Sequence, residues 1–161
     1  MNKKENKLIK NIRLNILKKT YEAKSSHIGS CYSIVEILYV LYFLVLKKKD
    51  TFILSKGHAA LALYCTLFEK KFLSRASLNS YGKNNTKLRA HASHKVKGIE
   101  FSTGSLGHGL PYAVGRALGE KIGEDDKRAD RVAIVRTCIV LYAVTVDTFI
   151  LLNILKNWLD K

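Results

Sequence analysis

The five histidines of this sequence all lie close to glycine or serine, which could place imidazole rings beside a bound ligand. Small neighbours let a ligand approach the backbone closely, and an imidazole can donate a hydrogen bond to phosphate or sugar oxygens. One such histidine alone is more often a surface or core residue than a functional one. The pairs are His27 with Gly29, His58 with Gly57, His91 and His94 on either side of Ser93, and His108 between Gly107 and Gly109.

A glycine cluster, Gly104, Gly107 and Gly109, precedes an expected helix from about residue 110 to 122. Backbone amides at the positive end of a helix can bind an anion, whereas the alternative is a tight turn with close helix packing. The spacing does not separate these two interpretations. It is not the dinucleotide-binding fingerprint, because the three-residue and two-residue spacings run in the wrong order.

Length and composition predict one domain covering residues 1–161, since 47% apolar residues can build a core. The formal net charge of +15 comes mainly from lysines spread along the whole chain, which favours anionic partners such as phosphorylated small molecules. A nucleic-acid-binding protein would usually gather its basic residues on one stripe, and no such stripe is seen. Three widely spaced cysteines and a polar N-terminus without an apolar signal core indicate a reduced, cytoplasmic protein.

The elements expected around these residues alternate between helix and strand, which predicts an α/β fold with a parallel sheet flanked by helices. Ser33 and Glu36 have capping-box spacing ahead of a helix over 34–46, and a strand over 52–54 enters the turn 55–58 and a helix over 59–70. A short helix over 74–81, a polar connection over 82–97 and a strand over 132–135 follow. A first amphipathic helix over 6–23 places on one face Ile9, Ile12, Ile16, Leu17 and Tyr21.

Four motifs, in this order and spacing, resemble the N-terminal portion of transketolases, most closely the split-type enzymes in which this half is a separate polypeptide. The resemblance covers about residues 8–128 and leaves 129–161 as a divergent tail. It implies the pyrophosphate-domain fold that binds thiamine diphosphate, in an incomplete form. The motifs are Ser25-Ser26-His27-Ile28-Gly29, Phe52-Ile53-Leu54-Ser55-Lys56-Gly57-His58, His91-Ala92-Ser93-His94-Lys95 and the run from Gly98 to Leu110.

The resemblance also implies an activity: transfer of a two-carbon ketol unit between sugar phosphates, in the cytoplasm and the pentose phosphate pathway, with thiamine diphosphate and Mg²⁺. His27 and His91 would be catalytic, lining the channel and bonding substrate hydroxyls, while His94 has no clear role. The cofactor makes and stores the carbanion, and imidazoles suit the remaining orientation and proton transfer. The cofactor-binding residues would be His58 at the diphosphate, Gly104 and Leu106 at the aminopyrimidine, and Gly107 and His108 beside them.

The tail departs from the family pattern. A Gly-Asp-Gly motif and a later asparagine should hold the metal, but no glycine follows Gly123, and the lone Asp147 supplies too few oxygen ligands. We therefore expect no metal ligands in this chain and a truncated or frame-altered tail. The family's catalytic glutamate belongs to a C-terminal partner subunit, with which a dimer or heterotetramer would form. The single chain is accordingly expected to be inactive.

Two alternatives remain open at this point. The first is a non-catalytic remnant that keeps only partner or phosphate binding, and the second is a basic protein that binds nucleic acid or a membrane surface. The apolar stretch 138–155 approaches the length of a membrane span, but Asp147 and Asn153 interrupt it. A buried strand followed by a helix is the expectation there, with no nucleic-acid or membrane partner.

Overall fold

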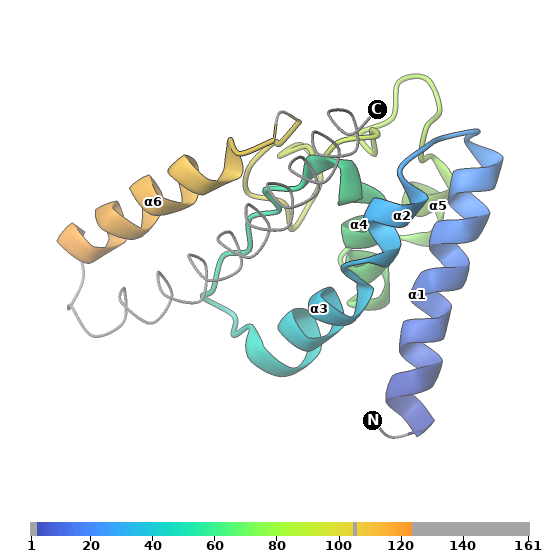
Figure 1. The fold of residues 1–161 in the computed structure, drawn as a ribbon, viewed down its shortest axis with the longest axis horizontal. Coiled ribbons are helices and arrows are strands. Elements are labelled where there is room, and N and C mark those ends of the chain that lie inside the picture. The colour runs from blue at the N-terminus through green and yellow to red at the C-terminus, as the bar shows by residue number, and fades with distance from the viewer. Residues whose placement is uncertain (1–2, 105, 124–161) are drawn as a thin grey trace, which may run out of the picture. The chain divides into compact units, whose positions relative to one another are not determined.

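The computed structural model describes residues 3–104 and 106–123 (Figure 1). The chain divides into two compact units, Met1–Gly109 and Leu110–Lys161, and each is described by itself. The elements of the first unit are mainly helical. In chain order they are α1 (Lys3–Glu22), α2 (Ile28–Tyr32), α3 (Val35–Val40), the π-helix η1 (Leu41–Val45), the 3₁₀-helix η2 (Gly57–Ala59), α4 (Ala60–Glu69) and α5 (Arg75–Asn79).

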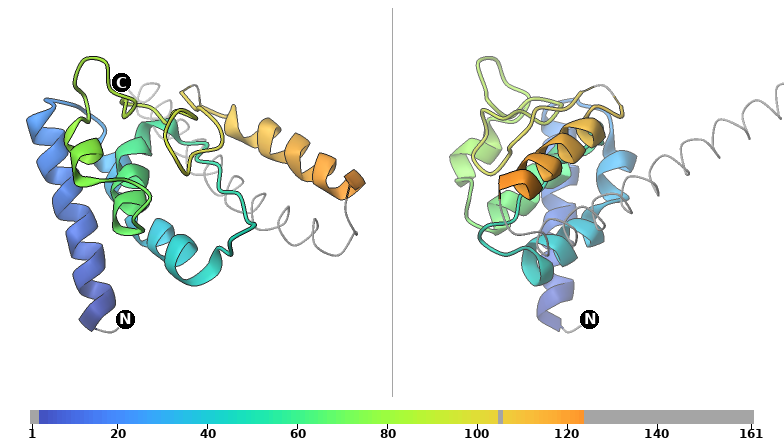
Figure 2. Two further views of the ribbon diagram at one scale, coloured as in Figure 1. Left: turned by 180° about the vertical axis from the view of Figure 1, so that it is seen from behind. Right: turned by 90° about the vertical axis from the view of Figure 1, so that its left-hand side faces the viewer.

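Helix α1 confirms the expected first helix and packs along α4, as both ribbon figures show (Figures 1 and 2). Its buried apolar residues are Ile9, Ile12 and Ile16. The prediction was wrong for Leu17 and Tyr21, which are 48% and 84% exposed. Lys19 is buried in their place, because its ammonium group pairs with Glu22 and its aliphatic stem can then cover apolar surface.

The predicted helix over 34–46 is divided into α3 and the π-helical turn η1. The capping box was wrong: Ser33 ends α2, its hydroxyl donates to the Ser30 carbonyl (2.9 Å), and α3 begins after Ile34 without a side-chain cap. Arg13 of α1 contacts this region through an ion pair with Glu36 and a cation–π contact with Tyr32. Glu36 is thus engaged with α1 instead of an N-terminal amide.

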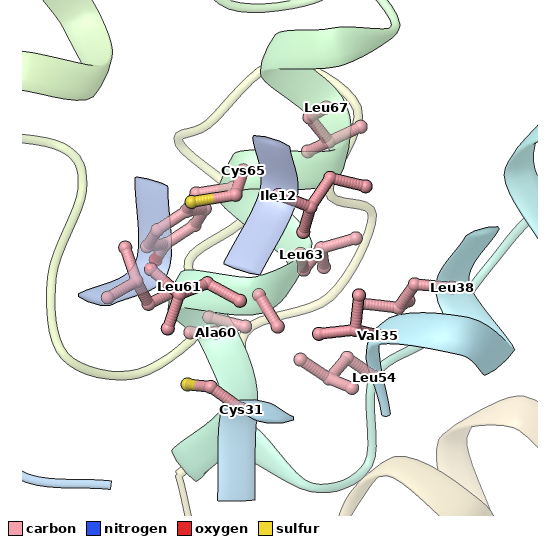
Figure 3. Packing of buried hydrophobic residues seen from close by; sticks show 14 of the residues in the cluster. Ile12, Cys31, Val35, Leu38, Leu54, Ala60, Leu61, Leu63, Cys65 and Leu67 are labelled. Atoms are coloured by element: carbon pink, nitrogen blue, oxygen red, sulfur yellow. The ribbon is translucent and has the colours of Figure 1, made fainter. Parts of the chain in front are cut away.

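Helix α4 forms the centre of the first unit, and every residue from Ala60 to Leu67 is buried. Such a helix, apolar on all sides, must be surrounded by other elements. Figure 3 shows Ile12 of α1 against α4, with Val35 and Leu38 of α3 on another side. Cys31 and Cys65 are free thiols in this core, in agreement with the prediction of no disulfide for these two.

The segment 52–54 enters η2 and α4 as predicted, but it is not a strand. Within residues 3–104 and 106–123 no residue has strand structure, because a strand requires a hydrogen-bonded neighbour and the described segments provide none. The second expected strand, over 132–135, lies outside the described residues. The predicted helix over 74–81 is confirmed as α5, capped by the Ser74 hydroxyl.

The connection over 82–104 contains turns and no helix, as expected for its polar sequence. It is drawn in yellow-green in both ribbon figures. The last described element, α6 (Gly109–Gly123), confirms the helix expected there. No helix within the described part of the chain is long and apolar enough to cross a membrane, and the stretch 138–155 lies outside that part.

Candidate functional site

Three of the five histidines come together in the first unit, although about 30 residues separate each from the next in sequence. The ring centroid of His58 lies 4.7 Å from that of His27 and 4.9 Å from that of His91, with both pairs edge to face. His27 and His91 are 6.0 Å apart. We call these three side chains the histidine cluster. Each is partly exposed, so the rings can reach a ligand from solvent.

Local backbone structure places His27 and His58. His27 precedes α2 in the left-handed region (φ 73°), which is uncommon for a residue other than glycine. Its carbonyl accepts the first hydrogen bond of α2 from the Cys31 amide (3.0 Å). The Cys31 thiol in turn donates to the His58 carbonyl (3.8 Å between sulfur and oxygen), so one short helix connects the two histidines.

A buried tyrosine supports the backbone of His91. The Tyr64 hydroxyl of α4 donates to the His91 carbonyl (2.9 Å), and the Tyr64 ring meets that of Tyr81 edge on. The Tyr81 hydroxyl donates to Ser25, two residues before His27 (3.4 Å). Sequence analysis missed Tyr64 and Cys31, because each lies in an apolar run and gives no signal beyond core packing.

The environment of His58 favours its neutral form. Partial burial lowers the pKa of His58 below the ordinary value of 6.5, and the positive charges that His27, His91 and Lys56 can carry lower this pKa further. A neutral imidazole can accept as well as donate a proton near neutral pH. An anion bound among these groups would reverse the balance, because it stabilises the protonated ring.

The stability of the chain should therefore depend on pH through His58. Since the pKa of His58 is lower in the folded chain than in the unfolded chain, stability is full above pH 6.5 and falls as pH drops through the lower folded value. Urea denaturation between pH 5 and pH 8 would measure this fall. His58→Gln should flatten the profile, whereas His94→Gln, at an exposed position outside the cluster, should leave it unchanged. Equal profiles for the parent chain and His58→Gln would contradict the assignment.

The other predicted site residues differ in where the structure places them. The Gly104 amide nitrogen lies 3.1 Å from where a Cβ on Gly57 would stand, so Gly104 is next to the turn that carries His58. No atom lies within 4 Å of a Cβ built on Gly104 itself, which leaves its backbone open to a ligand. Leu106, Gly107 and His108 are exposed and follow Gly104, with Gly107 at a positive φ of 89°.

His94 does not join the cluster. Its Nδ1 is 2.7 Å from the Ser102 hydroxyl, and this hydroxyl also accepts a hydrogen bond from the His94 backbone amide (2.9 Å). Within residues 3–104 and 106–123, no ring contact joins His94 or His108 to the histidine cluster. The structure therefore separates His91 from His94, which sequence alone placed together.

No metal centre is visible in the part of the chain that the structure describes. No group of three or more histidine, cysteine, aspartate or glutamate side chains there could hold a metal ion. The histidine cluster is included in that search, and Asp147 lies outside the described residues. What the described site offers is a set of imidazoles, an open backbone at Gly104 and the basic Lys56, which together suit a phosphorylated ligand.

Comparison with known families gives a match that covers most of the chain. Residues 4–151 match the family model described as "Transketolase, thiamine diphosphate binding domain". The match extends beyond residue 128, where the recognised motifs stop, and includes part of the tail over 129–161.

Individual relatives agree with this match. The chain is similar to a named subunit of the apulose-4-phosphate transketolase of Phocaeicola vulgatus (38% identical over 123 residues, 71% of this chain and 44% of the relative). It is also similar to the subunit of the same name from Actinobacillus succinogenes (43% over 105 residues, 59% and 38%) and to human transketolase (38% over 119 residues, 68% and 19%). The chain thus spans less than half the length of these relatives.

Proposed function

Because this chain belongs to the transketolase family, in the part that binds thiamine diphosphate, we propose that it acts as the N-terminal subunit of a split transketolase. Its reaction is the transfer of a two-carbon ketol unit between sugar phosphates. Two relatives are named as subunits of an apulose-4-phosphate transketolase, which supports both the divided organisation and a phosphorylated sugar as substrate.

The observation that carries this proposal is the histidine cluster. Three imidazoles from separate segments, with centroids 4.7 to 6.0 Å apart, can bond several neighbouring hydroxyls of one sugar at once. His27 and His91 orient the substrate and exchange protons with its hydroxyls. His58 lies between them and contacts the diphosphate of the cofactor, where a neutral ring can take up a proton as the anion arrives.

The cofactor-binding surface consists of Gly104, Leu106, Gly107 and His108, together with His58. The open space over Gly104 fits this role, because a side chain there would occupy the space through which the backbone reaches a ligand. Thiamine diphosphate, when bound, supplies the electron sink for breaking and making carbon–carbon bonds beside a carbonyl. The protein supplies binding, orientation and proton transfer.

A second polypeptide completes the site. The C-terminal transketolase subunit carries the glutamate that the family uses to activate the cofactor, and a dimer or heterotetramer is the resulting assembly. Mg²⁺ accompanies the diphosphate, but the described residues contain no cluster that could hold it. Its protein ligands therefore lie outside the described residues of this chain.

The fold follows from the same assignment. The thiamine diphosphate-binding domain of the family is α/β. We assign the segment 52–54 to the edge at which a parallel sheet presents η2 and the cofactor site, and residues 1–161 to one such domain. The proposed setting is carbohydrate metabolism in the cytoplasm, through the pentose phosphate pathway.

Calorimetry tests the proposal directly. Thiamine diphosphate with Mg²⁺ should bind when the chain is mixed with a C-terminal transketolase subunit from a split-type enzyme. Binding of neither cofactor nor partner would favour a remnant without this function. Tight, salt-sensitive binding of DNA or anionic liposomes in their place would favour a basic surface-binding protein.

A further inference from the structure

Thr103 is a buried polar residue that lies between the two segments carrying His58 and His91, and only 3% of it is exposed. Its hydroxyl donates to the Leu54 carbonyl, with 2.6 Å between the oxygens. Its backbone amide donates to the Ala92 carbonyl (3.1 Å). Leu54 is four residues before His58, and Ala92 directly follows His91, so one residue bonds to both segments.

Close packing adds a third connection. A Cβ on Gly57 would stand 2.5 Å from the Thr103 carbonyl oxygen, so only glycine allows the backbone before His58 to approach this closely. Thr103 therefore touches the turn of His58 on two sides, through Leu54 and through Gly57. A shift of Thr103 changes the distance between the rings of His58 and His91, which is 4.9 Å.

We propose that Thr103 is a positioning residue, whose buried hydroxyl holds His58 and His91 at the separation that the reaction requires. The catalytic part of this inference rests on the proposed function, whereas the geometric part does not. Valine would fill nearly the same volume but would leave the Leu54 carbonyl without its donor in a buried place. The segment leading to His58 would then move until that carbonyl met another donor.

The chain offers a matched control in Thr66 of α4. It is also buried, and its hydroxyl donates to the Ala62 carbonyl (2.9 Å), one turn earlier in the same helix. Thr66→Val removes a bond of the same kind without touching the segments of the histidine cluster. Both valine variants should lose similar thermal stability, so stability alone cannot distinguish a positioning role.

The experiment follows the histidine ring protons by NMR during a pH titration of the whole chain. Thr103→Val should shift the His58 and His91 signals and move the pKa of His58 towards 6.5, because the rings separate. Thr66→Val should leave these signals in place, and Thr103→Ser, which keeps the hydroxyl, should restore the parent titration. Should Thr103→Val fail to fold, Thr103→Ala removes the hydroxyl without overpacking and should produce the same shift.

Activity with the partner provides the second readout. Thr103→Val should lower kcat about tenfold with KM changed less than about twofold, since misplaced catalytic groups act on the chemical step. Unchanged histidine titrations and unchanged kcat in both Thr103→Val and Thr103→Ala would overturn the inference. An assembled parent enzyme without ketol transfer would refute the proposed function, while the NMR titration would still decide whether Thr103 holds the two rings.

Discussion

His58→Ala should lower kcat/KM of the assembled enzyme by at least about a hundredfold and weaken thiamine diphosphate binding at the same time. His58 is the central ring of the histidine cluster, in contact with both His27 and His91. A charge-assisted hydrogen bond to a phosphate contributes about 1.5 to 3 kcal/mol, which is about 10- to 150-fold in affinity. Loss of proton transfer at the substrate adds to this.

His94→Ala is the matched control for this prediction. Both histidines lie in motifs that resemble the family, but His94 is exposed and bonded to Ser102, away from the cluster. Isothermal titration with thiamine diphosphate and initial-rate kinetics would compare the two variants. Equal losses in both would show that the cluster geometry does not decide the contribution of a histidine, and the role given to His58 would be wrong.

Hydrophobic periodicity was sufficient to predict most helices of the described chain, because α1, α4, α5 and α6 each bury an apolar face or are closed by recognisable residues. It could not show that Lys19 would be buried and Tyr21 exposed. That exchange depends on Glu22 as an ion-pair partner and on where α4 lies, and both are tertiary facts. The capping-box prediction failed for a similar reason, because a tertiary contact engages Glu36 with Arg13.

The candidate site was predictable only in part. The resemblance to transketolases named His27, His58 and His91 together, whereas spacing alone gave no reason to prefer them over His94 or His108. Their meeting depends on backbone carbonyls held by Cys31, Tyr64 and Thr103. These supporting residues have no signature in sequence, since a buried thiol or hydroxyl looks like ordinary core until its acceptor is known.

The second large effect concerns the chain on its own, for which we expect no measurable ketol transfer even with excess thiamine diphosphate and Mg²⁺. Two contributions are missing from the described residues. No cluster there can bind Mg²⁺, so the negative charge of the diphosphate would be poorly neutralised. The activating glutamate that the family places in the C-terminal subunit is also absent, so bound cofactor would remain unreactive. A coupled ketol-transfer assay at saturating cofactor would measure this.

Addition of a C-terminal subunit distinguishes between the two contributions. If the glutamate alone is missing, the partner should restore turnover to the unmodified chain, and His58→Ala should abolish it. If the metal ligands are missing as well, turnover should require in addition that residues 132–161 be replaced by the corresponding segment of the P. vulgatus relative. Robust turnover by the unmodified chain without any partner would contradict both arguments, and would mean that residues of this chain bind the metal and activate the cofactor themselves.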